Sequence, residues 1–164
     1  MLQIRAAAEK DLETLLALVR RRREETGDTY YLDTNVIEAM LLKTVPGTVL
    51  LAFSDAVPVG YCAFTVCGSV RRARTELYLD DIYVVPEYRK QYFGKLLLNT
   101  AVRIASDYLC MAVEWVCDTT DGQSFFAHCG APAPVDGRYH VEVTGIPHLG
   151  EFVPSCGGHH TPNI

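Results

Sequence analysis

Residues 80–97 read DDIYVVPEYRKQYFGKLL, and this stretch decides the fold. It passes from an alternating aromatic and β-branched segment, through a proline, into a run with helical spacing of apolar residues. The first N–H groups of such a helix lack intrahelical partners, and the helix dipole places partial positive charge there. Gly94 lets a ligand approach the backbone, while Arg89, Lys90 and Lys95 add positive charge. The stretch therefore predicts an anion site, with a plain strand-to-helix turn as the alternative.

Hydrophobic spacing outward from this stretch predicts the remaining elements. Strands are expected over residues 2–5, 49–53, 57–66, 74–85, 111–117 and 138–143, and helices over residues 9–26, 35–43, 92–108 and 122–129. Thr34 is a candidate cap for the second helix, and Gly27 ends the first. The order β-α-α-β-β-β-α-β-α-β predicts an α/β (α+β) domain, a mixed sheet covered by helices, over residues 1–146, followed by a tail over 147–164.

Composition excludes several classes of function. The 164 residues are 49% hydrophobic and carry a formal charge of -5, so a single core is expected and no general basic field is available for nucleic acid. Four arginines at residues 20–23 could form a basic patch, although a solvated helix end suits the acidic chain better. The sequence has neither a signal peptide nor an apolar run of bilayer length, which predicts a cytoplasmic protein without membrane contact.

Six cysteines contain no C-x-x-C pair, and most of them lie in apolar stretches, so free thiols are expected. One group in the tail, Cys156 with His159 and His160, has zinc-ligand chemistry. It lacks a second ligand cluster at fixed spacing. A tail without metal is the preferred interpretation.

Three stretches resemble the GCN5-related N-acetyltransferases, the GNAT superfamily. Val84 to Leu98 is similar to the acetyl-CoA signature V-x-P-x-x-R-x-x-G-x-G/A, and Ser124 to Ala131 resembles the helix pattern F-Y-x-x-x-G-F/A. Leu77 to Val84 is similar to the L-Y-L-E-D phrase of the spermidine/spermine (diamine) acetyltransferase branch. The resemblance implies a mostly antiparallel mixed sheet with helices on both faces, acetyl-CoA as co-substrate, and a homodimer.

The resemblance also assigns roles to residues. Ile82, Tyr83 and Val84 would pair through their backbone with the pantetheine amides of acetyl-CoA. Residues implied as the pyrophosphate loop are Arg89, Lys90, Gln91, Tyr92, Phe93, Gly94 and Lys95. Thr119 falls where the family often has asparagine, and Asp80 falls where the diamine branch has a glutamate near the amine.

Three departures from the family pattern affect binding or chemistry. The stretch from Thr119 to Gly122 matches the pattern poorly, and the other two departures are single residues. Tyr92 replaces the first glycine of the loop, and Phe126 replaces the tyrosine that donates a proton to the departing CoA thiolate. A phenylalanine has no proton to donate. Tyr92, Tyr83, Tyr30, Tyr31 and His128 are therefore alternative acids, and the sequence does not rank them.

Acetyl transfer to an amine also needs a group that attracts the ammonium ion and removes its proton. Asp80 and Asp81 are adjacent, so regular alternation places them on opposite sheet faces, and the resemblance selects Asp80 for this role. The alternative is that both carboxylates only satisfy neighbouring polar groups. Asp81, Tyr30 and Tyr31 are further candidates for contact with the substrate.

These features predict an acetyl-CoA-dependent N-acetyltransferase acting on a primary amine of a small molecule, either a polyamine or an amino-acid-like compound. One alternative is a catalytically impaired acyl-CoA-binding or interaction module, favoured by the substitutions at Tyr92, Thr119 and Phe126. Another is a protein or peptide N-acetyltransferase.

Overall fold

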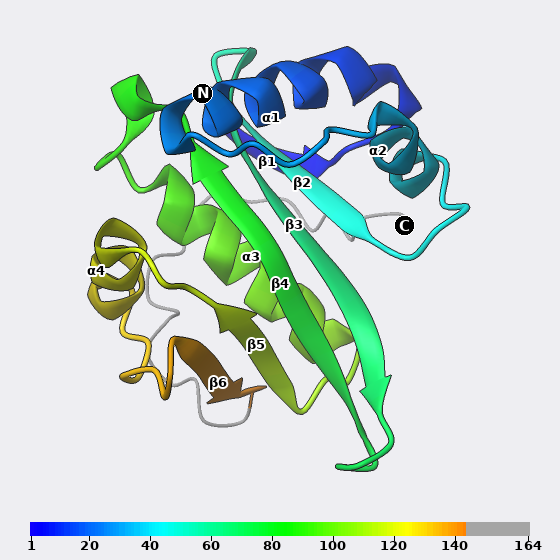
Figure 1. The fold of residues 1–164 in the computed structure, drawn as a ribbon, viewed down its shortest axis with the longest axis vertical. Coiled ribbons are helices and arrows are strands. Elements are labelled where there is room, and N and C mark those ends of the chain that lie inside the picture. The colour runs from blue at the N-terminus through cyan, green and yellow to red at the C-terminus, as the bar shows by residue number, and fades with distance from the viewer. Residues whose placement is uncertain (144–164) are drawn as a thin grey trace.

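A computed structural model describes residues 1–143 of the chain. In this part a six-stranded sheet has the order β1-β2-β3-β4-β5-β6. The strands are β1 (Leu2–Ala6), β2 (Thr48–Ser54), β3 (Val57–Ser69), β4 (Arg74–Val84), β5 (Ala112–Val116) and β6 (Arg138–Glu142). Neighbouring strands are antiparallel except β4 and β5, which are parallel (Figure 1). The predicted mixed, mostly antiparallel sheet is confirmed.

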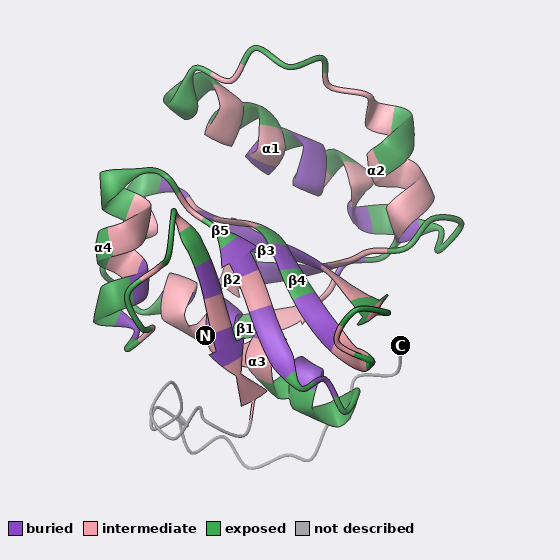
Figure 2. Cartoon of the chain, turned by 60° about the horizontal axis from the view of Figure 1, so that its bottom comes forward, coloured by how far each residue is buried: buried purple, intermediate pink, exposed green. Residues whose placement is uncertain are grey.

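Helices cover both faces of this sheet. They are α1 (Leu12–Thr26), α2 (Thr34–Leu41), α3 (Phe93–Asp107) and α4 (Thr120–His128), with short 3-10 helices η1 (Glu9–Asp11) and η2 (Pro86–Tyr88). Helices α1 and α2 lie on one face, and α3 and α4 lie on the other (Figure 2). The predicted order of elements is confirmed.

Helix ends differ slightly from the predicted ones. Asp33, not Thr34, caps α2, because its side chain accepts a hydrogen bond from the Asn35 N–H at 3.0 Å. Gly27 ends α1 with a left-handed φ of 69°, as predicted. Helix α3 begins at Phe93, one residue later than expected.

The start of α1 is fixed by a buried ion pair. Asp11 accepts hydrogen bonds from both terminal nitrogens of Arg5, at 2.7 and 2.8 Å, and one from the Ala8 N–H at 2.9 Å. The Asp11 side chain is only 8% exposed. Hydrogen bonding to Arg5 lowers the pKa of Asp11 below its ordinary value.

The described cysteines, Cys62, Cys67, Cys110, Cys117 and Cys129, are free thiols, as predicted. Cys156, His159 and His160 lie outside the described residues, as does the predicted end of the domain at residue 146. Between residues 1 and 143, every helix is too short or too polar to cross a bilayer.

Candidate functional site

Strands β4 and β5 share only a short parallel contact, which opens one edge of β4. The pairing joins Glu76–Tyr78 to Ala112–Glu114. Strand β4 continues to Val84, and the two strands separate along it (Figure 1). The backbone of residues 79–84 therefore has an edge that β5 does not pair, and such an edge can bind an extended ligand through main-chain hydrogen bonds.

A β-bulge lies in this segment of β4. Leu79 pairs with Phe64 and Asp81 pairs with Ala63, so Asp80 is the additional residue of the bulge. Phe64 lies beside Ile104 of α3, which places Leu79 on the α3 face and Asp80 on the α1 face.

Asp81 also faces α1, because its carboxylate contacts Arg22 of that helix. The prediction that Asp80 and Asp81 lie on opposite faces is therefore wrong. The bulge breaks the alternation on which it depended.

The two carboxylates have different surroundings. Asp80 is exposed, and its side chain forms no hydrogen bond or ion pair within residues 1–143. Asp81 accepts hydrogen bonds from the Tyr61 hydroxyl at 2.6 Å and from the Arg22 Nε at 3.0 Å. Burial raises the pKa of Asp81 above its ordinary value, although both partners oppose this shift. Burial also raises the pKa of Tyr61, and the negative charge of Asp81 is the next largest cause of this increase.

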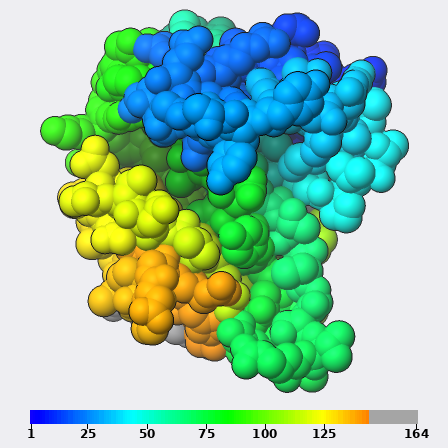
Figure 3. Space-filling model, in the orientation of Figure 1, coloured from blue at the N-terminus to red at the C-terminus, as the bar shows by residue number. Residues whose placement is uncertain are grey.

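The face that carries Asp80 is open to solvent. In the space-filling view, β4 (green) reaches the surface below the α1 and α2 segment (blue) and beside α4 (yellow) (Figure 3). Tyr30 and Tyr31, in the loop between α1 and α2, are 82% and 89% exposed. Both residues are therefore accessible to a ligand.

The loop before α3 has an unusual backbone. Lys90 and Tyr92 both adopt left-handed conformations, with φ of 59° and 69°. This region is costly for residues other than glycine, and such strain is often found at ligand-binding turns. Tyr92 thus takes the conformation that the family's glycine adopts easily, and its side chain is 61% exposed.

The start of α3 is suited to an anion. Its first intrahelical hydrogen bond runs from the Leu96 N–H to the Tyr92 carbonyl, so the preceding N–H groups of the first turn have no helical acceptor. The first turn has no acidic residue. A hollow of about 360 Å³ beside it is lined by Gln91, Tyr92, Phe93, Lys95, Leu2, Leu96 and Asn99. Four residues of the predicted pyrophosphate loop therefore meet around one concave surface.

Arg89 is engaged within the protein. Its Nε donates to the Val84 carbonyl at 2.9 Å, and its Nη2 donates to Glu25 of α1 at 2.8 Å. Tyr83 is buried, and its hydroxyl donates to the same Glu25 carboxylate at 3.1 Å. Burial and then Glu25 raise the pKa of Tyr83. Arg89 therefore occupies one of the two lone pairs of the Val84 carbonyl.

Phe126 is a core residue. It is 4% exposed and packs against Trp115 and Tyr139, with ring centroids 4.8 and 5.3 Å away. Thr119 is used as the cap of α4, where its hydroxyl accepts from the Gly122 N–H at 3.3 Å. His128, at the end of α4, is exposed.

Gly94 is packed against α4. A Cβ atom at this position would lie 2.9 Å from the Phe125 ring. The glycine therefore allows α3 and α4 to approach each other, in addition to any contact it makes with a ligand.

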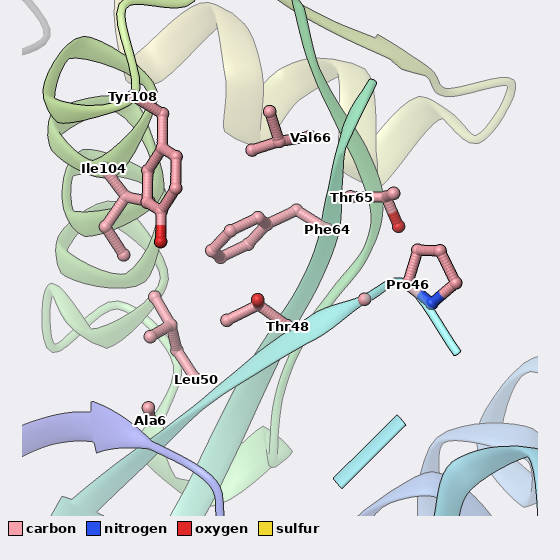
Figure 4. A pocket seen from close by; sticks show the side chains of 10 residues that line it. Ala6, Pro46, Thr48, Leu50, Phe64, Thr65, Val66, Ile104 and Tyr108 are labelled. Carbon is pink, nitrogen blue, oxygen red and sulfur yellow. The ribbon is translucent and has the colours of Figure 1, made fainter. Parts of the chain in front are cut away.

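A second cavity lies elsewhere in the fold. It has a volume of about 180 Å³ and is bordered by Phe64, Ile104 and Tyr108, near the C-terminal end of α3 (Figure 4). None of the predicted site residues lines it.

A charged cluster that the sequence did not predict lies on β4, β5 and β6. Ligand atoms of Glu76, Glu114 and His140 lie within 4.8 Å of one another, as in a metal site. Arg72 contacts both glutamates, and Arg74 contacts Glu76 and lies 3.0 Å from His140. Two arginines at the same carboxylates repel a cation, so the cluster is an ion-pair network.

Residues 12–131 match the profile of the Acetyltransferase (GNAT) family. The chain belongs to this family. It is an N-acetyltransferase, and acetyl-CoA is its co-substrate.

Solved structures have the same fold at low sequence identity. An aminoglycoside acetyltransferase from an uncultured soil metagenomic sample, in complex with sisomicin, is 21% identical, with a TM-score of 0.68 over 82% of this chain and 91% of that one. The PaiA N-acetyltransferase of Thermoplasma acidophilum, in complex with coenzyme A, is 19% identical, with a TM-score of 0.69 over 87% and 98%.

A third structure, the ribosomal-protein-alanine N-acetyltransferase of Brucella melitensis, is 18% identical, with a TM-score of 0.68 over 81% and 93%. At these identities the likeness shows the fold alone. The specific likeness to the spermidine/spermine branch stays a prediction.

The described residues fit acetyl-CoA. The open edge of β4 offers main-chain groups to an extended pantetheine arm. The start of α3 offers N–H groups, and Lys90 and Lys95 offer charge, to phosphates. Sequence reasoning missed Arg22, Tyr61 and Glu25, which hold Asp81, Tyr83 and Arg89 in place.

Proposed function

We propose that this acetyltransferase transfers an acetyl group from acetyl-CoA to a primary amine of a small molecule, a polyamine or an amino-acid-like compound. The observation that carries the proposal is the exposed carboxylate of Asp80 at the bulge of β4, which has no partner within residues 1–143. It lies at the start of the strand edge to which the pantetheine arm would bind. Two of the similar structures are named as acetyltransferases of amine-bearing compounds, an aminoglycoside and a ribosomal protein.

Asp80 would act on the amine. An alkylamine with a pKa near 10.4 is almost wholly protonated at neutral pH and cannot attack a carbonyl in that form. A carboxylate attracts the ammonium ion and accepts its proton, directly or through a water molecule. Asp80 is suited to this role because no arginine or lysine within the described residues neutralises it.

Other residues would hold the co-substrate. The backbone of Ile82 and Val84 would pair with the pantetheine amides, and the loop from Arg89 to Lys95 would bind the pyrophosphate. Acetyl-CoA supplies an activated acetyl thioester with a thiolate leaving group. A thiol of this kind has a pKa near 8.5 and leaves tolerably as an anion, so the absence of a hydroxyl at Phe126 is compatible with turnover.

The proposal is tested by release of the CoA thiol with a panel of small amines, peptides with free N-termini, and lysine peptides. Acetylation of small amines supports it. Acetylation of peptides alone favours the protein acetyltransferase, and binding of acetyl-CoA without any turnover favours the impaired module.

Asp80→Asn tests the assigned base. Turnover should fall by about 10²- to 10⁴-fold, while affinity for acetyl-CoA, measured by calorimetry, stays unchanged. Asp107→Asn, at the exposed end of α3, is the matched control and should leave both unchanged. Equal turnover of Asp80→Asn and the wild type from about pH 6 to 9 would reject the role of Asp80. The predicted homodimer can be tested on the same samples by sedimentation.

A further inference from the structure

Arg22, in the last part of α1, connects the bulge to the loop between α1 and α2. Its Nε lies 3.0 and 2.8 Å from the two carboxylate oxygens of Asp81, and its Nη1 lies 3.5 Å from Asp28. Asp28 in turn accepts a hydrogen bond from the Tyr30 N–H at 2.9 Å. Arg22 therefore links the carboxylates of the acceptor site to the loop that carries the exposed tyrosines.

Arg22 also changes the charge of this site. The Asp81 side chain is 23% exposed and that of Arg22 is 30% exposed, so their attraction is only partly screened by solvent. The Tyr61 hydroxyl uses a further lone pair of Asp81. Asp81 thus keeps little capacity to bind a cation from solution.

The neighbouring acids are paired as well. Glu25 binds Arg89, Asp28 binds Arg22 and Arg23, and Glu87 binds Arg21. Along the part of β4 that faces α1, Asp80 is the carboxylate that no cation within residues 1–143 neutralises.

We infer that Arg22 is a specificity-determining residue, which neutralises Asp81 so that the acceptor site favours amines with a single positive charge over linear diamines and polyamines. The inference rests on the proposed function and narrows its substrate class: of the two acceptor classes proposed, it disfavours polyamines and keeps compounds with one ammonium group. One ammonium group can pair with Asp80. A second ammonium group nearby cannot pair with Asp81, which Arg22 already neutralises, and it is repelled by the charge of Arg22. The free-energy cost of removing this second group from water is therefore not compensated.

The test compares amines of matched length: pentylamine against 1,5-diaminopentane, and butylamine against 1,4-diaminobutane. The wild type should have the higher kcat/KM for the monoamine in each pair. Arg22→Gln frees Asp81 for a second ammonium group and should shift the ratio toward the diamine by about 10- to 100-fold, the value of one charge-assisted hydrogen bond. The KM for acetyl-CoA should stay within about twofold, since Arg22 has no contact with the start of α3.

Three further variants separate charge from structure. Arg22→Lys keeps the positive charge and should keep most of the wild-type selectivity. Asp81→Asn leaves the charge of Arg22 without its main partner and should shift the ratio in the opposite direction, toward the monoamine. Arg23→Gln, the control, contacts Asp28 but not Asp81 and should leave the ratio unchanged.

The result for Arg22→Gln counts only if the thermal unfolding of this variant remains cooperative. If it does not, the inference is decided by whether Asp81→Asn shifts the substrate ratio toward the monoamine. An unchanged ratio in a folded variant, with acetyl-CoA kinetics intact, overturns the inference and leaves the proposed function standing. A wild type that prefers diamines also overturns it. A wild type that binds acetyl-CoA but acetylates no small amine overturns the proposed function, and the inference with it.

Discussion

Replacement of Tyr92 by glycine tests the interpretation of the loop before α3. A non-glycine residue in the left-handed region costs about 1–2 kcal/mol, and Tyr92 has a φ of 69°. Glycine removes this cost but adds about 0.5–1 kcal/mol of chain entropy to the unfolded state. The net gain in the free energy of unfolding is about 0–1.5 kcal/mol. This corresponds to a rise in Tm of at most about 6 °C for a domain of this size.

The same change should strengthen binding of acetyl-CoA. The side chain of Tyr92 borders the hollow at the start of α3, and its removal lets a phosphate come closer to the first N–H groups of the helix. One additional charge-assisted hydrogen bond is worth about tenfold or more in Kd. Isothermal titration calorimetry with CoA and acetyl-CoA measures this value directly.

Two variants serve as controls. Lys90→Gly relieves the same kind of strain at a φ of 59° but removes a positive charge, so Tm should rise while Kd does not improve. Tyr92→Phe keeps the ring and the strain and removes only the hydroxyl, so turnover should stay unchanged. A loss of about 100-fold or more in turnover would instead identify Tyr92 as the general acid. A lower Tm or weaker binding of CoA in Tyr92→Gly would refute the interpretation, because the tyrosine itself would then stabilise the loop or the ligand.

Three further perturbations address packing and pH. Gly94→Glu must displace the Phe125 ring and should lower the free energy of unfolding by about 1–3 kcal/mol. The control is Gly68→Glu, where a Cβ atom would have no neighbour within 4 Å, and it should change this free energy by less than about 0.5 kcal/mol. Chemical denaturation measures both values. Phe126→Tyr buries a hydroxyl in the aromatic cluster and should lower the free energy of unfolding by about 1–3 kcal/mol without raising turnover. A variant with higher turnover and an unchanged Tm would instead show that this side chain reaches the thioester. Because the pKa of Asp11 is lowered in the folded state, the Asp11 carboxylate stabilises the fold above the ordinary pKa of about 3.9, and this contribution is lost as pH falls through the folded-state pKa. Asp11→Asn should therefore lower the free energy of unfolding by about 3 kcal/mol at pH 7 and make it less sensitive to acid below about pH 4. If the stability of the variant and of the wild type falls in parallel with decreasing pH, Asp11 does not have this role.

The order of elements could be predicted because its signals are local. Helix α3 has an apolar stripe, and a proline ends the extended segment before it. The turn of α1 into its loop is set by Gly27. None of these signals depends on a distant part of the chain.

The geometry of the candidate site could not be predicted in the same way. The bulge at Asp80 depends on how β4 pairs with β3. Asp80 and Asp81 interrupt the polar and apolar alternation of β4 in the sequence, but two adjacent acids do not by themselves indicate which residue is added at a bulge. The burial of Phe126 depends on Trp115 and Tyr139, which come from two other strands.

One signal for Arg22 was present in the sequence. Leu15 and Val19 belong to the apolar stripe of α1, and Arg22 continues the stripe at the next helical spacing. A charged residue on the buried side of a helix needs a partner, so this position predicts an ion pair with the sheet. The run of four arginines concealed it, because such runs are usually solvated.

Helix α1 therefore has a direct connection to both halves of the site. Arg22 and Glu25 are three residues apart, on the same side of the helix. Arg22 holds Asp81, next to the acceptor carboxylate, while Glu25 holds Tyr83 and Arg89, at the start of the phosphate loop. Each ion pair is partly exposed and contributes little to stability alone. Their combined effect is positional: a shift of α1 would move the acceptor side and the co-substrate side of β4 together, because both are fixed to one rigid helix.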